Sequence, residues 1–444
     1  MKGRIKYILT AVVATILFGM LSFRATGLLQ EKKTAAGELS LYQTTDRAVE
    51  TAGRIMYPWD IGKKDGRIAL TDAEIAAQGK TGSKSESEKG KNEESTDMDI
   101  NQEDGQGVTQ NEQKKSQAVD DASATATPEP EKIEITVSAA GDCTFACDES
   151  LVGSNDFNHV YEAQGAAYFF REVKSVFAKD DLTIVNLEGT LTEQGTRQDK
   201  TWAFRGSPEY VKILQEGSVE AVSFANNHCQ DYGEISYQDT MKYLDEADVI
   251  YSSYEKIAVV EKKGIRIGLI SVSWTEDTEA TLRSAIKKLK KEKTDLQIVS
   301  MHCGIERDAL PDEQQKSLAR IAIDEGGADL VLGHHPHVLQ GVEKYKDAYI
   351  IYSLGNFSFG GNTNPDDKDT MIFQQKFTFI DGALQQDDAV QVIPCRLSST
   401  TEYNDYQPVV LEGDAKKRVI QKINERSEGF EISFKKSGKV KKES

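Results

Sequence analysis

The chain contains the stretch Leu330-Val331-Leu332-Gly333-His334-His335-Pro336-His337, in which a short apolar run ends at a glycine and three histidines follow. The whole chain has only six histidines, so half of them lie in this stretch. A short apolar run that stops at glycine is typical of a buried parallel strand, and ligands commonly bind at the carboxyl ends of such strands. Imidazole nitrogens are natural ligands for Zn²⁺, Mn²⁺ or Fe. A surface loop that happens to be rich in histidine is the alternative, and the rest of the chain decides between them.

Polar side chains follow four other predicted strands in the same way. These strands span 133–139, 182–185, 221–224 and 296–301, and they are followed in that order by Asp142, by Glu188, by Asn227 with His228, and by His302. Each cluster alone is a weak signal, because a Gly-Asp turn is more often a helix cap and Asn-Asn-His is more often a simple turn. Their repetition at successive strand ends favours one shared site over a surface loop.

Helical segments separate the predicted strands. Apolar residues at helical spacing predict helices over 168–178, 208–216, 234–247, 278–293 and 311–325. A hairpin is expected at 257–260 and 265–272, a further strand at 348–352, and an antiparallel pair at 370–380 and 390–396. Strands that alternate with helices predict the α/β class.

The residues at the strand ends have the chemistry of a metal centre. Two carboxylates, one amide and three or four imidazoles are expected to meet at one edge of the sheet. This mixture of oxygen and nitrogen donors suits one or two ions of Mn, Fe or Zn. A bridging carboxylate can hold two ions about 3.5–4 Å apart, which orients a phosphoryl group and lowers the pKa of a bound water. A histidine beside the ions can donate a proton to the leaving oxygen.

Charge and cysteine content exclude several other classes of protein. Acidic residues (72) outnumber basic ones (54), and the net charge of −18 argues against non-specific nucleic-acid binding. Five cysteines without a C-x-x-C pair indicate neither a disulfide framework nor a zinc finger. Cys143, Cys229 and Cys303 neighbour proposed site residues, and we expect them to face away from the site as packing groups, because successive side chains on extended backbone point to opposite sides. Thiolate ligation of a metal is the outside alternative.

The amino-terminal region predicts a membrane anchor. Lys2, Arg4 and Lys6 precede an apolar run over 7–23, which as a helix would span about 26 Å, enough for a bilayer core. Basic residues in front place the amino terminus in the cytoplasm and the rest of the chain outside. We therefore expect a single-pass cell-membrane protein with its main domain outside the cytoplasm. A cleaved signal peptide is the alternative, although no A-x-A cleavage site follows closely.

Composition divides the chain into five segments. Residues 1–27 form the cytoplasmic stub and transmembrane anchor, and 28–78 form a juxtamembrane segment with possible short helices. Residues 79–132 have too few apolar side chains to offset the entropy of ordering and are expected to be a disordered acidic linker. The main domain spans 133–400. The extension 401–444 ends in a charged tail, in which a helix from Lys416 is expected to fray.

Six short motifs occur in order along the main domain. They are Gly141-Asp142, Asn186-Leu187-Glu188-Gly189, Asn226-Asn227-His228 with Asp231-Tyr232-Gly233, His302-Cys303-Gly304-Ile305-Glu306, Gly333-His334-His335-Pro336-His337 and Ser353-Leu354-Gly355-Asn356-Phe357. Together they resemble the CapA family of capsule (poly-γ-glutamate) synthesis proteins, a branch of the calcineurin-like metallophosphoesterase superfamily. The resemblance implies a metallophosphoesterase-like four-layer α/β/β/α sandwich, preceded by the transmembrane helix and the disordered linker.

The resemblance also implies a role for each site residue. His228 would be the catalytic residue, as a proton donor or as a stabiliser of the developing negative charge. His334 precedes the His-Pro-His core, and its role is less defined. The expected metal ligands are Asp142 at the first metal, Glu188 in the bridging position, Asn227 and His302 at the second metal, and His335 and His337, which complete the shell.

Other residues are expected to support this centre. Asp231 and Glu306 would orient histidines as hydrogen-bond acceptors behind the ligands, and Asp231 as a helix cap is nearly as good an interpretation. Arg205 matches a Phe-Arg element of the family and would bind a substrate anion together with Asn356; a surface salt bridge explains Arg205 equally well. The superfamily has a histidine two residues after its first aspartate, where this chain has Thr144.

Two functions remain open from the sequence. The first is a metal-dependent hydrolase of phosphoester or related anionic bonds, acting in capsule or poly-γ-glutamate synthesis or export. The second is a non-catalytic accessory subunit of a membrane polymer-synthesis complex, which Thr144 favours and His228 opposes. Both imply the membrane, an anionic polymer or phosphoester and other subunits as partners, and neither implies nucleic acid.

Overall fold

The computed structural model describes residues 130–441, except 152, 154, 255, 276 and 386–388. All of these residues belong to one compact unit, which spans Val119–Ser444. The predicted anchor (1–27), the juxtamembrane segment (28–78) and all but the last three residues of the predicted linker (79–132) lie outside the described residues. Across 130–441, no helix has both the length and the apolar character needed to cross a bilayer.

The first sheet combines a parallel half with an antiparallel half. Its main path runs in the order β17-β16-β14-β1-β2-β5-β6, while β13 pairs with β1 and β15 pairs with β14. The parallel half comprises β1 (Lys132–Thr144), β2 (Leu182–Leu187), β5 (Ala221–Ser223), β6 (Ile250–Ser252) and β13 (Asn356–Phe359). The antiparallel half comprises β14 (Asp369–Ile380), β15 (Ala383–Gln385), β16 (Val390–Arg396) and β17 (Val409–Val410).

The second sheet is parallel at its centre and antiparallel at both edges. Its order is β11-β12-β10-β9-β8-β7. The parallel strands are β8 (Ile265–Ser273), β9 (Leu296–His302), β10 (Leu330–His334) and β12 (Ala348–Ile351), and the edge strands are β7 (Ala258–Lys262) and β11 (Val342–Tyr345). A separate two-stranded ladder joins β3 (Thr190–Leu191) to β4 (Arg205–Gly206).

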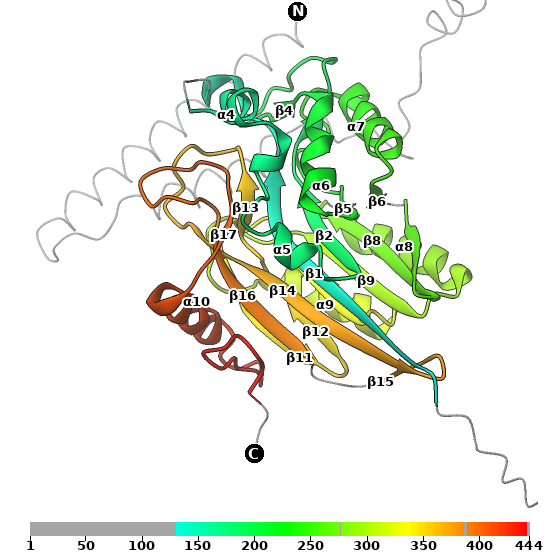
Figure 1. Cartoon of the computed structure of the whole chain (residues 1–444). Coiled ribbons are helices and arrows are strands. Elements are labelled where there is room, and N and C mark those ends of the chain that lie inside the picture. Colours follow the sequence, from blue (N-terminus) through cyan, green and yellow to red (C-terminus); the bar gives the residue numbers. More distant parts are fainter. Residues whose placement is uncertain are drawn as a thin grey trace, which may run out of the picture. The chain divides into compact units, whose positions relative to one another are not determined.

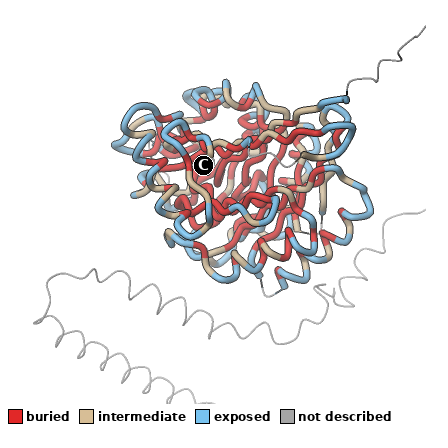
Figure 2. The backbone as a smooth tube through the Cα atoms, turned by 90° about the horizontal axis from the view of Figure 1, so that it is seen from below, coloured by how far each residue is buried: buried red, intermediate tan, exposed pale blue. Residues whose placement is uncertain are grey.

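Alternating side chains on the central strands build four layers. On β10, Leu330 and Leu332 point into the apolar core between the two sheets, together with Ile135 and Val137 of β1. Val331 points the other way, toward helices. The first sheet is covered by α4 (Phe157–Gln164), α5 (Lys174–Phe177), α6 (Lys212–Gly217) and α7 (Glu234–Glu246), and the second by α8 (Thr278–Glu292) and α9 (Glu313–Asp324). The predicted α/β/β/α sandwich is therefore present (Figure 1), with its buried residues concentrated in the interior and its exposed residues at the periphery (Figure 2).

A last helix, α10 (Gly413–Arg426), packs against the end of the sandwich. Val419, Ile420 and Ile423 of this helix join the core between the sheets. The tail beyond it does not fray at once as expected, because Lys439 and Val440 form bridges with Gln391 and Phe434. The carboxyl-terminal extension is thus part of the folded domain as far as residue 441.

Most predicted elements are present, and the exceptions have two causes. The hairpin and the antiparallel pair are confirmed as β7–β8 and β14–β16. The single helix predicted over 168–178 is wrong, since only Lys174–Phe177 is α-helical and a 3-10 turn at Ala166–Tyr168 precedes it. Phe169, Phe170 and Phe177 are buried in one aromatic cluster. Their helix-like spacing in the sequence therefore reflects this burial and not a continuous helix. The short elements α4 and β13 were not predicted, because neither has a long periodic pattern.

A close approach between two backbones delivers the first site residue. The pairing of β1 with β2 shifts register between Ala139 and Asp142, and the Asp142 N–H donates to the Gly355 carbonyl at 2.9 Å. A Cβ at Gly141 would lie 1.8 Å from the same Gly355 oxygen. Gly141 is required because no side chain fits between these backbones.

We expect Gly141→Ala to lower the free energy of unfolding by about 1–3 kcal/mol, because the added methyl group forces two backbone segments apart. Gly153→Ala is the matched control, since nothing lies within 4 Å of the position that its added methyl group would take. Chemical denaturation of the two variants measures the difference. Equal stability of both variants would contradict the close approach.

Candidate metal centre

The predicted site residues come together at one end of the sandwich, between the two sheets. In the first sheet Asp142 lies near the end of β1, and Glu188 and His228 follow β2 and β5, whereas in the second sheet His302 ends β9 and His335 follows β10. The expectation of a single sheet edge is therefore wrong. The face-to-face packing of the sheets brings the carboxyl ends of two parallel strand sets to the same place.

Asp142, Glu188 and His337 form one possible ligand group. One carboxylate oxygen of each acid and one ring nitrogen of His337 all lie within 4.8 Å of one another. His337 Nδ1 is 3.3 Å from Asp142 Oδ2, and His337 Nε2 is 3.8 Å from Glu188 Oε1. Both carboxylates are fully buried. Asp142 was predicted for the first metal, Glu188 for the bridging position and His337 for the completion of the shell.

Asn227, His302 and His335 form a chain of contacts on the other side of Glu188. His302 Nε2 lies 2.8 Å from Asn227 Oδ1 and 3.1 Å from His335 Nδ1. The same His302 nitrogen is 3.6 Å from Glu188 Oε1. Glu188 thus contacts both halves of the site, as the predicted bridging position requires.

The Glu188 carboxylate has no hydrogen-bond donor among the residues that the structure describes. Imidazole nitrogens of His302, His228 and His337 lie 3.6, 3.8 and 3.8 Å from its Oε1. Burial raises the pKa of Glu188 well above its usual value. A buried carboxylate without a donor is costly, and a cation held by the surrounding nitrogens would remove that cost. The donor set therefore fits a divalent metal.

Asp142 and His337 shift each other's pKa in opposite directions. Burial opposes ionisation of Asp142, but its contacts with His334 and His337 hold the pKa of its carboxyl well below the usual range. Burial alone would lower the pKa of His337, yet Glu188 and Asp142 raise it to about 10. In the metal-free protein, a proton on His337 thus partly balances the carboxylates.

Two of the remaining imidazoles are held in the neutral form. Burial lowers the pKa of His302 well below its usual value, and burial together with His337 lowers that of His335 to about 4. Neutral imidazole is the form that binds metals.

The loop after β10 is strained at two ligand positions. His335 has a φ of 95° and His337 a φ of 57°, a region that residues other than glycine rarely adopt. Each such residue costs about 1–3 kcal/mol. This turn places both imidazole rings beside the carboxylates of the site. The strained backbone lowers the stability of the fold but positions the ligands.

His228 stands beside the ligands and is oriented from behind. Its Nδ1 lies 2.6 Å from Asp231 Oδ2, and its Nε2 faces Glu188. Asp231 also accepts hydrogen bonds from Lys200 Nζ at 2.6 Å and from the Phe204 N–H at 2.6 Å. Asp231 thus has the orienting position that was predicted for it.

Two residues of the site received no role from the sequence. Lys200 Nζ binds Asp231 and also donates to the Asn227 carbonyl at 2.9 Å. Asn186 Nδ2 donates to Asp142 Oδ1 at 2.9 Å and lies 3.2 Å from His302 Nδ1. Asn186 belongs to the same motif as Glu188, which is a signal that could have identified it. Lys200 comes from a loop with no such pattern.

The predicted substrate residues lie in different surroundings. Asn356 Oδ1 is 2.8 Å from His337 Nδ1, so its amide contacts a ligand. The Arg205 guanidinium lies over the Tyr232 ring, 4.1 Å from its centroid, and 3.6 Å from Glu149. His334 is buried with its Nδ1 3.3 Å from Asp142 Oδ1, and neither ring nitrogen has a hydrogen-bond partner in the described part of the chain.

The cysteines beside the site face away from it, as expected. Cys143 and Cys229 pack in the apolar layer that covers the first sheet, and Cys303 packs in the layer that covers the second. Burial raises the pKa of all three thiols. Buried, protonated thiols are inert packing groups rather than metal ligands.

Comparison with known proteins finds one family and several relatives. The model of the family described as "Bacterial capsule synthesis protein PGA_cap" matches residues 136–361. "Capsule biosynthesis protein CapA" of Bacillus anthracis is 29% identical over 255 residues, which are 51% of this chain and 60% of that protein. "PGA biosynthesis protein CapA" of Bacillus subtilis (strain 168) is 32% identical over 225 residues, which are 45% of this chain and 59% of that protein. The chain thus matches about three fifths of each relative's length.

Comparison with solved structures gives matches at low sequence identity. A calcineurin-like phosphoesterase, YfkN from Bacillus subtilis, is 13% identical with a TM-score of 0.36, and the match covers 66% of this chain and 98% of that one. A hypothetical protein from Thermus thermophilus is 16% identical with a TM-score of 0.39, and the match covers 59% of this chain and 98% of that one.

We expect Mn²⁺ to raise the melting temperature of the protein and Glu188→Gln to abolish that rise, because the variant lacks the carboxylate shared by both halves of the site. At a Mn²⁺ concentration of about 100 times Kd, the stabilisation amounts to about 2.7 kcal/mol. Thermal unfolding with EDTA and with Mn²⁺ measures it.

Glu343→Gln serves as the control for this experiment. Glu343 is a buried acid on β11, where its carboxylate accepts hydrogen bonds from Arg320 and Tyr352, and it belongs to neither group of candidate metal ligands among the described residues. This variant should lose stability in EDTA but keep the full response to Mn²⁺. A wild-type response in Glu188→Gln would refute the ligand assignment.

Proposed function

Because the chain belongs to the PGA_cap family of bacterial capsule synthesis proteins, we propose that it acts in the synthesis or export of an anionic cell-surface polymer as a metal-dependent hydrolase. Its substrate class is a phosphoester or a related anionic bond. The relatives named for capsule and PGA biosynthesis support the role in the polymer pathway. The geometry of the metal centre supports hydrolysis.

The observation that carries this proposal is the Glu188 carboxylate, which is fully buried between imidazoles from both sheets and has no hydrogen-bond donor among the described residues. A structural carboxylate would have hydrogen-bond donors. A carboxylate surrounded at 3.6–3.8 Å by ring nitrogens leaves room for cations in between.

The ligands divide into two sets that share Glu188. The first set adds Asp142 and His337, and the second adds Asn227, His302 and His335. These residues would hold one or two ions of Mn, Fe or Zn. When bound, such ions would polarise the phosphoryl oxygen and lower the pKa of a water molecule, so that hydroxide is available at neutral pH.

His228 supplies the proton in this proposal. Asp231 holds its Nδ1 at 2.6 Å, which leaves Nε2 directed toward Glu188 and the reacting groups. In its protonated form, His228 donates from Nε2 to the leaving oxygen. Phe204 packs on the imidazole at 4.4 Å, and Lys200 fixes Asp231, so the ring is held in place on two sides.

The proposal includes the membrane and further subunits as partners. An apolar run at 7–23 behind three basic residues supports a single-pass anchor with the folded domain outside the cytoplasm. Polymer synthesis at a membrane requires other components, and this domain would act on the anionic polymer or on a phosphoester precursor next to them.

A non-catalytic accessory subunit is the second candidate, and Thr144 favours it. The superfamily's histidine is missing at this position, and the buried Thr144 hydroxyl has no hydrogen-bond partner among the described residues. In that case the fold would serve as a binding platform in the same complex.

We expect the detergent-solubilised full chain to hydrolyse an aryl phosphate in the presence of Mn²⁺ and His228→Ala to reduce kcat by about 10²–10⁴-fold, because the leaving oxygen loses its proton donor. His159→Ala is the matched control, since the His159 ring, on α4, pairs with the N-cap residue Asp156 and belongs to neither candidate ligand group among the described residues. Bound metal per chain is measured for each variant by atomic emission.

The outcomes separate the two candidates. Retained metal with lost turnover in His228→Ala supports the hydrolase. A wild-type chain that binds the metal but turns over no anionic ester supports the accessory subunit instead.

A further inference from the structure

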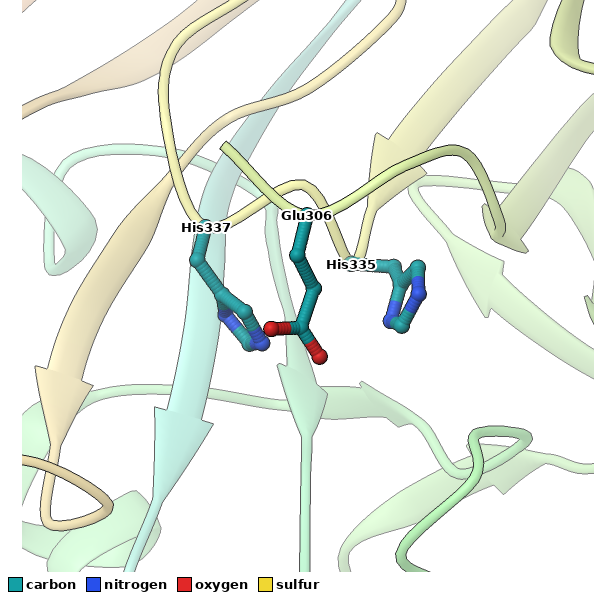
Figure 3. A group of neighbouring side chains, drawn as sticks. All are labelled: Glu306, His335 and His337. Carbon is teal, nitrogen blue, oxygen red and sulfur yellow. The ribbon is translucent and has the colours of Figure 1, made fainter. Parts of the chain in front are cut away.

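We propose that Glu306 is a direct metal ligand that completes the centre from its solvent side. The proposal rests on the metal centre of the proposed function and adds a third carboxylate to it. One oxygen of Glu306 and one ring nitrogen each of His335 and His337 lie within 4.8 Å of one another. Figure 3 shows the Glu306 carboxylate between the two imidazoles.

The sequence predicted a different role, which the contacts do not support. As an orienting acceptor, Glu306 would receive a hydrogen bond from one of the histidines. Instead, His337 Nδ1 lies 2.8 Å from Asn356 Oδ1, and His335 Nδ1 lies 3.1 Å from His302 Nε2. Among the described residues, no hydrogen bond or ion pair engages the Glu306 carboxylate. Its oxygens therefore remain available to a cation.

The loop that carries Glu306 is fastened to the loop that carries the histidines. The Cys303 N–H donates to the His334 carbonyl at 3.1 Å, and the Arg307 N–H donates to the Pro336 carbonyl at 2.8 Å. These bonds flank Glu306 on both sides along the chain. The backbone at Glu306 thus has a fixed place relative to the turn that carries His335 and His337.

Backbone geometry on both sides of Glu306 reinforces this placement. Gly304 has a φ of 118° and packs against the Gln315 side chain, where a Cβ would lie 2.7 Å from Gln315 Cδ. Arg307 has a φ of 65°. Glycine adopts a positive φ without steric cost, but at Arg307 it is unfavourable, and such strained residues cluster at active sites and ligand clamps.

A solvent-exposed acid alone would prove nothing, but a second observation points to a cation here. His337 belongs both to the Glu306 group and to the buried group of Asp142 and Glu188. Glu188 is fully buried and its oxygens have no hydrogen-bond partner among the described residues, whereas Glu306 is exposed, so His337 is shared by a buried and an exposed carboxylate. A cation in the centre would meet carboxylates from both directions.

This arrangement also accounts for Thr144. The first metal position lacks the histidine that the superfamily has at the place of Thr144. Glu306, which lies beside His337, supplies an additional ligand. Replacement of an imidazole by a carboxylate makes the ligand set more anionic and richer in oxygen. Such a set favours a hard cation such as Mn²⁺ over Zn²⁺.

The test compares Glu306→Gln, Glu306→His and the control Glu313→Gln in the full chain. Glu313 is an exposed acid on α9 that pairs only with Lys316 in the described structure. Mn²⁺ and Zn²⁺ affinities are measured by calorimetry, and bound metal per chain by atomic emission. Since loss of an outer hydrogen-bond partner already costs about 10–100-fold in affinity, we expect Glu306→Gln to weaken Mn²⁺ binding by about 100-fold or more. Glu306→His should recover Zn²⁺ binding but not Mn²⁺ binding, because it restores a nitrogen ligand.

The outcomes distinguish this inference from the proposed function. If Glu306→Gln binds Mn²⁺ as the wild type and Glu313→Gln do, the inference is overturned and the centre with its hydrolase function stands. An unchanged preference between Mn²⁺ and Zn²⁺ in Glu306→His also overturns it. If the metal results are as expected but the wild type hydrolyses no ester, Glu306 is a ligand and the hydrolase proposal fails. A wild type that binds no metal overturns both.

Discussion

The apolar contact between the two sheets is what assembles the candidate centre. Leu330 and Leu332 of one sheet pack with Ile135 and Val137 of the other, and both sets of parallel strands end at the same side of the sandwich. Burial of this interface contributes about 25 cal/mol per Å² of apolar surface removed from water. That favourable term offsets the cost of holding carboxylates and imidazoles together without solvent. The metal centre is therefore a property of the packed layers rather than of any single loop.

The strand ends could be predicted because their chemistry is local in the sequence. Each ligand follows its own apolar strand within a few residues, so periodicity and residue type place Asp142, Glu188 and His302 without knowledge of the fold. The assignment of these strands to two sheets is a matter of long-range pairing, which no local pattern records. For the same reason the role of Lys200 could not be predicted, because a loop brings it to Asp231 from a distance in sequence.

Packing also explains where the secondary-structure predictions failed. Phe169, Phe170 and Phe177 recur at helical spacing, but they fill a cluster in which Phe157 and Phe357 also lie, and the chain turns twice to bury them all. Local propensity is weak enough for such burial to override it. Glu306 is the opposite case. Its motif pointed to the site correctly, whereas its relation to His335 and His337 follows only from two hydrogen bonds between loops.

The last helix, α10, contacts the segment that follows the histidine ligands, although this helix lies outside the residues that the family model matches. The segment that follows His337 is held from behind by the end of α10, where Arg426 donates to the Leu339 carbonyl and Ser427 Oγ accepts the Val342 N–H at 2.9 Å. A Cβ at Gly341 would lie 2.1 Å from the Arg426 oxygen, so helix and ligand segment are in contact at the backbone. The family match ends at residue 361, well before this helix. The part of the chain that holds the turn of His335 and His337 in place thus extends at least to Ser427. The family model matches only part of this region.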